Sequence, residues 1–104
     1  MIFRRARFDD VIRRQLDLFA RDHADLVRAC DEAERAYDGA ERDEAEERYG
    51  EYVDLVEEGT EALADIRDAF KRTLDEDTGE AYEAAFNRAV RKQLPRFGLE
   101  IDLR

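Results

Sequence analysis

Two stretches of the chain decide its fold: residues 12–37, IRRQLDLFARDHADLVRACDEAERAY, and residues 45–70, AEERYGEYVDLVEEGTEALADIRDAF. In both stretches, apolar or small residues recur at alternating steps of four and three. This heptad spacing keeps one stripe of a helix facing a partner helix. We therefore expect two long helices that pack along a common seam. The seam positions are Ile12, Leu16, Phe19, His23, Leu26, Cys30, Ala33 and Tyr37 in the first stretch, and Ala45, Tyr49, Tyr52, Val56, Gly59, Leu63, Ile66 and Phe70 in the second.

The second stretch matches the first when it is folded back along it. Ile12 then lies opposite Phe70, and every seam position between the two ends has a partner. Large residues tend to face small ones, which fills the space between helices without strain. The clearest case is Gly59, which costs about 1 kcal/mol in a helix relative to Ala. We expect its missing side chain to make room for the imidazole of His23.

Capping and helix-breaking residues around these stretches predict where each helix begins and ends. Gly39 is a C-cap residue between the two helices, and Pro95 ends a third amphipathic stretch. The predicted fold class is all-α, with a long antiparallel helical hairpin of the coiled-coil type, a short third helix and an extended C-terminal tail. We expect one domain over residues 1–104, with helices at about 10–38, 44–75 and 78–94 and the tail at 95–104.

The tail is predicted to be extended because its apolar residues alternate. Phe97, Leu99, Ile101 and Leu103 are separated by Gly98, Glu100 and Asp102. A period of two is typical of an extended segment with one buried side. Such a segment needs an apolar surface to lie on.

Charge is distributed unevenly along the chain. The net charge is −10, with 28 acids beside 16 arginines and two lysines, and residues 31–61 alone hold 14 acids and three arginines, a net of −11. A solvated tip that keeps the protein soluble and a docking surface for a basic partner both fit this acidity. Nucleic acid should be repelled from it. The arginine-rich composition fits either a GC-rich genome or adaptation to high salt.

The amino-terminal segment is basic, with Arg4, Arg5 and Arg7 in residues 1–8. It has no apolar signal region behind it, and no apolar run reaches the roughly 18 residues of a membrane helix. One cysteine cannot form an internal disulfide, which fits a reducing compartment. We expect a cytoplasmic protein with neither nucleic acid nor membrane as a partner.

The seam residues offer little chemistry. His23 lies among apolar positions, and Ala20 stands where a di-metal carboxylate protein would carry the Glu of its Glu-x-x-His motif. Cys30 lies about 10 Å along the helix from His23, too far for an ion pair, so a packed, inert thiol is expected. The sequence predicts a protein that is not an enzyme, with no cofactor, no metal site and no catalytic residues.

Function is therefore expected to lie in helix surfaces. We predict an interaction or scaffold module that forms a homodimer, because the third helix covers only the lower half of the hairpin. The acidic tips favour an antiparallel pair, in which each tip faces the partner's base with Arg88, Arg91, Lys92 and Arg96. In a monomer, the tail would instead lie along the upper half of the hairpin.

The alternative function is a small acidic inhibitor or antitoxin-like protein whose tip binds a basic partner. The candidate interaction surface comprises Val27, Val53, Leu55, Phe97, Leu99, Ile101 and Leu103.

Overall fold

The fold is all-α, as the sequence predicts. A computed structural model describes residues 7–104, which contain helices and no strand. Arg4 and Arg5 of the basic amino-terminal segment lie outside the described residues. The elements are α2 (Asp9–Asp22), α3 (Ala24–Asp38), α4 (Ala45–Lys71), α5 (Glu76–Gln93), the 3-10 helix η1 (Pro95–Phe97) and α6 (Gly98–Ile101).

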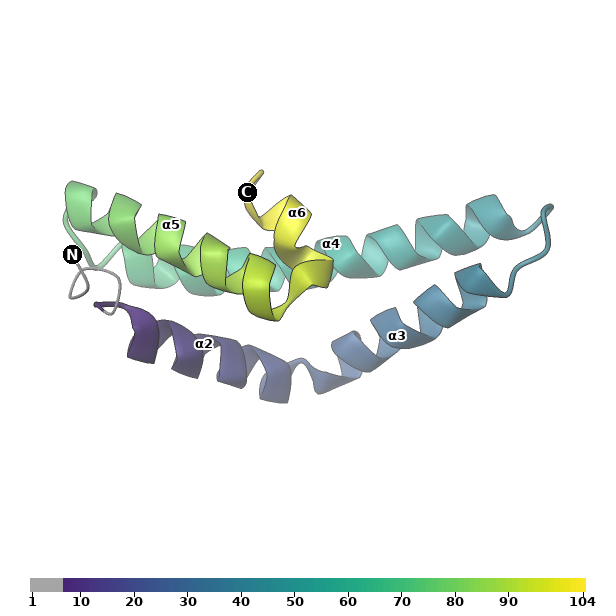
Figure 1. Ribbon diagram of the computed structural model, residues 1–104, viewed down its shortest axis with the longest axis horizontal. Helices are drawn as coiled ribbons and strands as arrows, with labels where there is room; N and C mark the ends of the chain where they lie inside the picture. Colours follow the sequence, from purple (N-terminus) through teal and green to yellow (C-terminus); the bar gives the residue numbers. More distant parts are fainter. Residues whose placement is uncertain (1–6) are drawn as a thin grey trace.

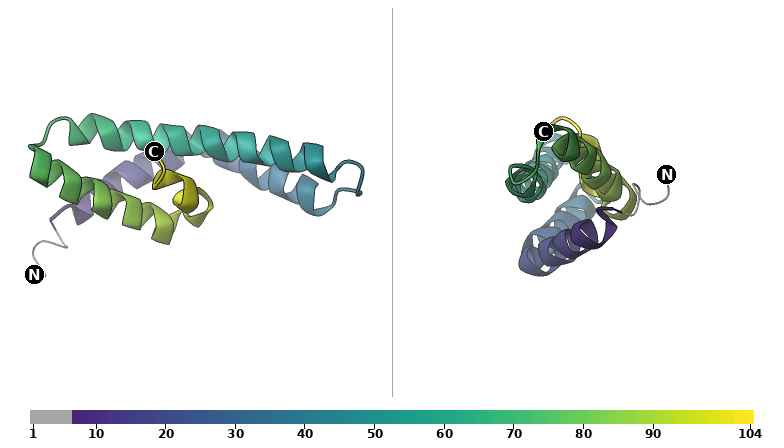
Figure 2. Two further views of the ribbon diagram at one scale, coloured as in Figure 1. Left: turned by 90° about the horizontal axis from the view of Figure 1, so that it is seen from above. Right: turned by 90° about the vertical axis from the view of Figure 1, so that its left-hand side faces the viewer.

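The helices form a rod that measures 51 × 23 × 23 Å. α4 runs back beside α3 after a short loop, and α5 returns along the other half of α4 (Figure 1). Seen end-on, α2, α4 and α5 surround a common interior (Figure 2). The rod therefore has a three-helix base and a two-helix arm. We use "arm" for residues 31–61 and "base" for residues 7–30 and 62–104.

The single helix expected over residues 10–38 is interrupted at His23. This residue has φ −116° and ψ 29°, and α2 and α3 meet there at an angle (Figure 1). The tail packs close to this break: the Phe97 ring lies edge-on against Phe19, with 5.7 Å between ring centroids. A Cβ atom on Gly59 would lie only 2.5 Å from Cε1 of Phe97. Gly59 thus makes room for Phe97, rather than for His23 as expected from the seam.

The tail is helical, which corrects the extended segment predicted from its alternation. Pro95 begins η1, and α6 follows directly. Phe97 and Ile101, four residues apart, are buried, whereas Leu99 and Leu103 are 81% and 78% exposed. This spacing places the two pairs on opposite sides of one helical turn. A strand would have placed all four side chains on the same side.

A buried arginine holds the tail against the base. Arg67 is only 1% exposed, and its Nε donates a hydrogen bond to Oδ1 of Asp68 at 2.9 Å. Its Nη1 donates to Oδ1 of Asn87 at 3.0 Å and to the carbonyl of Ile101 at 3.1 Å. Its Nη2 donates to the carbonyl of Arg104 at 2.8 Å. These bonds join α4 to the carbonyl of the last residue of α6 and to the carbonyl of Arg104, three residues further on.

The remaining helix boundaries lie close to the expected ones. α4 ends at Lys71, a few residues earlier than predicted. α5 begins at Glu76, two residues earlier than predicted, because Asp75 caps it: Oδ1 of Asp75 accepts a hydrogen bond from the backbone N–H of Thr78 at 2.8 Å. The apolar core lies mainly in the base and consists of Phe8, Ile12, Leu16, Phe19, Cys30, Val56, Leu63, Ala64, Tyr82, Phe86, Val90, Phe97 and Ile101.

Candidate interaction surfaces

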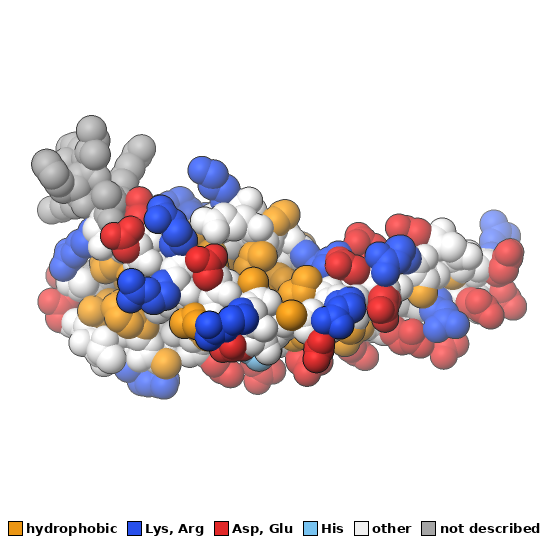
Figure 3. All heavy atoms as spheres, turned by 90° about the horizontal axis from the view of Figure 1, so that it is seen from below, with side chains coloured by type: hydrophobic (Ala, Val, Ile, Leu, Met, Phe, Trp, Pro, Cys, Tyr) orange, Lys and Arg blue, Asp and Glu red, His pale blue; other side chains and the backbone are white. Residues whose placement is uncertain are grey.

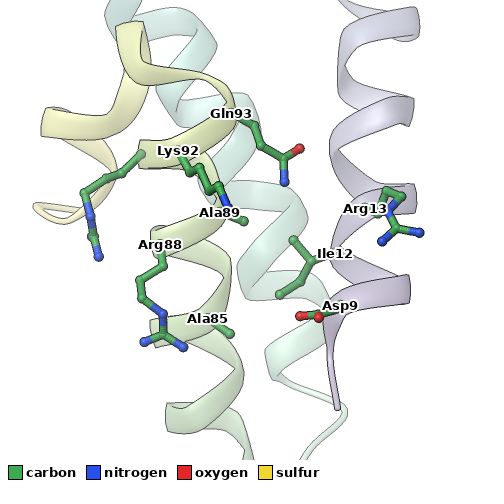
Figure 4. A pocket seen from close by; sticks show the side chains of 9 residues that line it. Asp9, Ile12, Arg13, Ala85, Arg88, Ala89, Lys92 and Gln93 are labelled. Carbon is green, nitrogen blue, oxygen red and sulfur yellow. The ribbon is translucent and has the colours of Figure 1, made fainter. Parts of the chain in front are cut away.

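A groove of about 1040 Å³ runs between α2 and α5 at the base (Figure 4). Its apolar part is Ile12 on α2 and the small side chains Ala85 and Ala89 on α5, which face the space between the two helices (Figure 4). We call it the basic groove because cations outnumber acids four to one among the described residues that line it. The lining residues are Asp9, Ile12, Arg13, Ala85, Arg88, Ala89, Arg91, Lys92 and Gln93.

Two of the four cations already have acidic neighbours. Arg91 binds Asp102 through Nη1, at 2.6 Å from Oδ1 and 2.8 Å from Oδ2. Arg13 lies 3.8 Å from Asp10, and both side chains are largely exposed. Exposed pairs of this kind contribute at most about 1 kcal/mol to stability.

Arg88 and Lys92 make no ion pair within residues 7–104, and both are exposed. They lie four residues apart on α5, so they project from one face of that helix. The basic groove therefore offers two cations to an acidic ligand, in a molecule whose net charge is −10.

Arg96 does not join this set, although the sequence suggested a basic end made of Arg88, Arg91, Lys92 and Arg96. Its Nη1 lies 2.8 Å from Asp31, and its Nη2 donates to Glu34 at 2.8 Å. Its guanidinium also lies over the ring of Tyr52, 5.8 Å from the centroid. Partial burial disfavours the charged form, but the contacts with these three residues outweigh it and raise the pKa of Arg96. Arg96 thus ties η1 to the molecule's own arm.

The arm presents acids around a pair of exposed aromatic rings. Tyr37 and Tyr49 are 39% and 52% exposed, and their ring centroids are 5.2 Å apart. Acidic side chains outnumber basic ones at the narrow end of the rod, whereas basic, acidic and apolar side chains are mixed at the wide end (Figure 3). The two ends of the molecule are therefore chemically different.

The candidate surface predicted from the sequence does not form one continuous patch. Phe97 and Ile101 are buried inside the chain and are not accessible to a partner. Val27 and Leu55 are half-buried against the core. Val53 is half-buried in the arm, and Leu99 and Leu103 are the well-exposed members.

The floor of the basic groove lies outside the interaction surface predicted from the sequence. A signal was present, since Ala85 with Ala89 and Arg88 with Lys92 are both four apart in one amphipathic stretch. Nothing in the sequence marked Arg67 as buried, because its partners include carbonyls of the tail.

The side chains of His23 and Cys30, the two seam residues with reactive groups, pack against neighbouring residues. His23 stacks on Phe19, with 5.1 Å between ring centroids. Cys30 is fully buried, and this burial raises the pKa of its thiol, although the charge of Arg96 acts in the opposite direction. In the part of the chain that the structure describes, no three His, Cys, Asp or Glu side chains are grouped so as to hold a metal ion. None of the described helices is both long and apolar enough to cross a membrane.

Comparison of the chain with protein-family models, with curated protein sequences and with solved structures finds no match.

Proposed function

We propose that this chain is a non-enzymatic helical interaction module that associates with a second copy of itself. In this proposal it acts in the cytoplasm as an antiparallel helical hairpin of the coiled-coil type. The observation that supports it best is the two-helix arm, whose outer end exposes Tyr37 and Tyr49.

An arm of two helices has only one seam in which to bury apolar side chains. In the base, α5, η1 and α6 cover α4, but they do not extend over the outer end of the arm (Figure 1). The half-buried Val53 and the exposed tyrosine pair therefore have little cover within residues 7–104. Helices bury such faces against another element, and a second copy of the hairpin supplies one in a four-helix arrangement.

The mass of the chain in solution tests this proposal. We expect light scattering at micromolar concentration to give twice the 12.2 kDa of one chain. Replacing Tyr37 and Tyr49 with Ser should weaken the dimer, because aromatic side chains contribute strongly to interfaces. Leu18→Ser, at a position 38% exposed on α2, is the control and should leave the mass unchanged. A mass of 12.2 kDa at every concentration would refute self-association.

The acidity of the arm supports a second candidate function, a small acidic inhibitor or antitoxin-like protein. Its net charge of −11 and its exposed tyrosine pair suit a basic surface on another protein. Capture of such a partner from a lysate should weaken steeply as salt is raised, because exposed charges are screened. Capture that persists at high salt would instead indicate apolar helix docking.

A further inference from the structure

We propose that the basic groove of one copy receives the acidic arm of a second copy, in a dimer with a two-fold axis. This inference rests on the self-association proposed above and adds which surfaces meet. The occupant is a second copy because this chain itself carries the chemistry that complements its groove.

Charge complementarity is the first argument. The arm carries a net charge of −11, whereas the α5 side of the groove presents Arg88 and Lys92 without an ion-pair partner in residues 7–104. Bringing the arm to these cations pairs opposite charges. An arrangement with two arms side by side would place like charges together, which costs several kcal/mol at an interface.

The apolar parts of the two surfaces also match. The groove has a floor of Ile12, Ala85 and Ala89, which is shallow because two of its members are alanines (Figure 4). The arm presents the flat rings of Tyr37 and Tyr49. A tyrosine suits such a site, since its ring can lie on the alanines while nearby guanidinium and ammonium groups contact its face or hydroxyl.

The two surfaces lie toward opposite ends of the rod. The tyrosine pair lies at the outer end of the 51 Å rod, and the groove lies in the base at the other end (Figures 1 and 4). Two rods laid side by side in opposite directions bring each arm end over the partner's groove. The interface is then isologous and closes at two copies.

Two charge-reversal variants test the pairing. R88E/K92E makes the groove acidic, and E41R/E46R places two arginines near the tyrosine pair and reduces the net charge of the arm from −11 to −7; all four positions are exposed. Each variant alone should dissociate about 100-fold more readily than the wild type, since like charges then meet in both contacts. R14E/R72E changes the net charge as much as R88E/K92E at exposed positions outside the groove, and it should leave the dimer nearly unchanged. Circular dichroism of each variant verifies that it is folded.

Mixing the two variants gives the decisive result. In a mixed dimer, the unaltered arm of one variant meets the unaltered groove of the other, and the two arginines introduced in one arm meet the two glutamates introduced in the other groove. We expect the mixture to recover a dimer by light scattering, with affinity within about tenfold of the wild type. Failure of the mixture to associate, or unchanged dimers of both single variants, would overturn the arm-in-groove pairing while leaving self-association intact. A monomeric wild type would overturn both.

Discussion

At the scale of the residue, Gly59 shows how a small side chain can serve a distant part of the sequence. The seam predicted that Gly59 leaves room, and the structure shows a ring above it. The ring is Phe97 of the tail rather than His23 of the facing helix. Heptad spacing predicts which residues of two helices face each other. It contains no information about a third segment that packs against both helices.

Replacing Gly59 with Ala should destabilise the protein by up to about 2 kcal/mol. Ala favours a helix by about 1 kcal/mol, but its Cβ would overlap the Phe97 ring, and overpacking costs about 1 to 3 kcal/mol. Gly50→Ala is the matched control on the same helix, because nothing lies within 4 Å of the added atom. It should stabilise the protein, and so should Gly59→Ala in a Phe97→Ala background. Urea unfolding measures each change, and equal stabilisation by both single variants would contradict this packing.

Tyr82 is the residue whose ionisation should be most visible. Its side chain is fully buried and its hydroxyl donates to Oε1 of Gln15 at 2.8 Å. Burial raises the pKa of Tyr82 to about 12, although the hydrogen bond to Gln15 opposes the rise.

Tyr82 should make stability fall as the pH rises from about 10 to about 12. In this range the unfolded chain loses the phenol proton while the folded chain still holds it, so deprotonation favours unfolding. The contribution is complete below pH 10 and amounts to about 3 kcal/mol for a pKa raised from about 10 to about 12. Urea unfolding of Tyr82→Phe should show a shallower alkaline decline than the wild type, since other groups titrate equally in both. Parallel declines would contradict a buried, proton-retaining phenol.

At the scale of the element, the tail shows why alternation alone misleads. Apolar residues at positions 97, 99, 101 and 103 fit a strand with one buried face, and they fit equally a helical turn with one buried and one exposed pair. The structure has the second arrangement, in which Phe97 enters the core and Arg67 binds the last carbonyls. In so short a segment, these tertiary contacts decide the conformation.

Alanine substitution in the tail should distinguish the two conformations. Ile101→Ala should lower the unfolding free energy by about 3 kcal/mol, because a fully buried side chain is truncated. Leu99→Ala, two residues away, should change it by less than about 0.5 kcal/mol, because that side chain is 81% exposed. An extended tail with one buried side would give two similar losses, which urea unfolding at equilibrium would reveal.

At the scale of the whole molecule, the sequence predicted the helical class and most of the residues that pack between α2, α3 and α4. Those residues repeat with a strong period. The break at His23 has no local signal in the sequence, and the burial of Arg67 depends on where the last residues of the chain lie. The basic groove likewise arises only when α2 and α5, far apart in the sequence, come together.

The two arms lie far apart in the proposed antiparallel dimer, and the distance between them can be measured. A spin label at Ala36→Cys sits on the exposed side of α3 near the end of the arm, while the buried thiol of Cys30, with its raised pKa, should resist labelling. Pulsed dipolar spectroscopy of the labelled chain should then give an intermolecular distance close to the 51 Å length of the rod. A distance of about 20 Å, roughly two helix diameters, or no intermolecular coupling at all would contradict the arm-in-groove dimer.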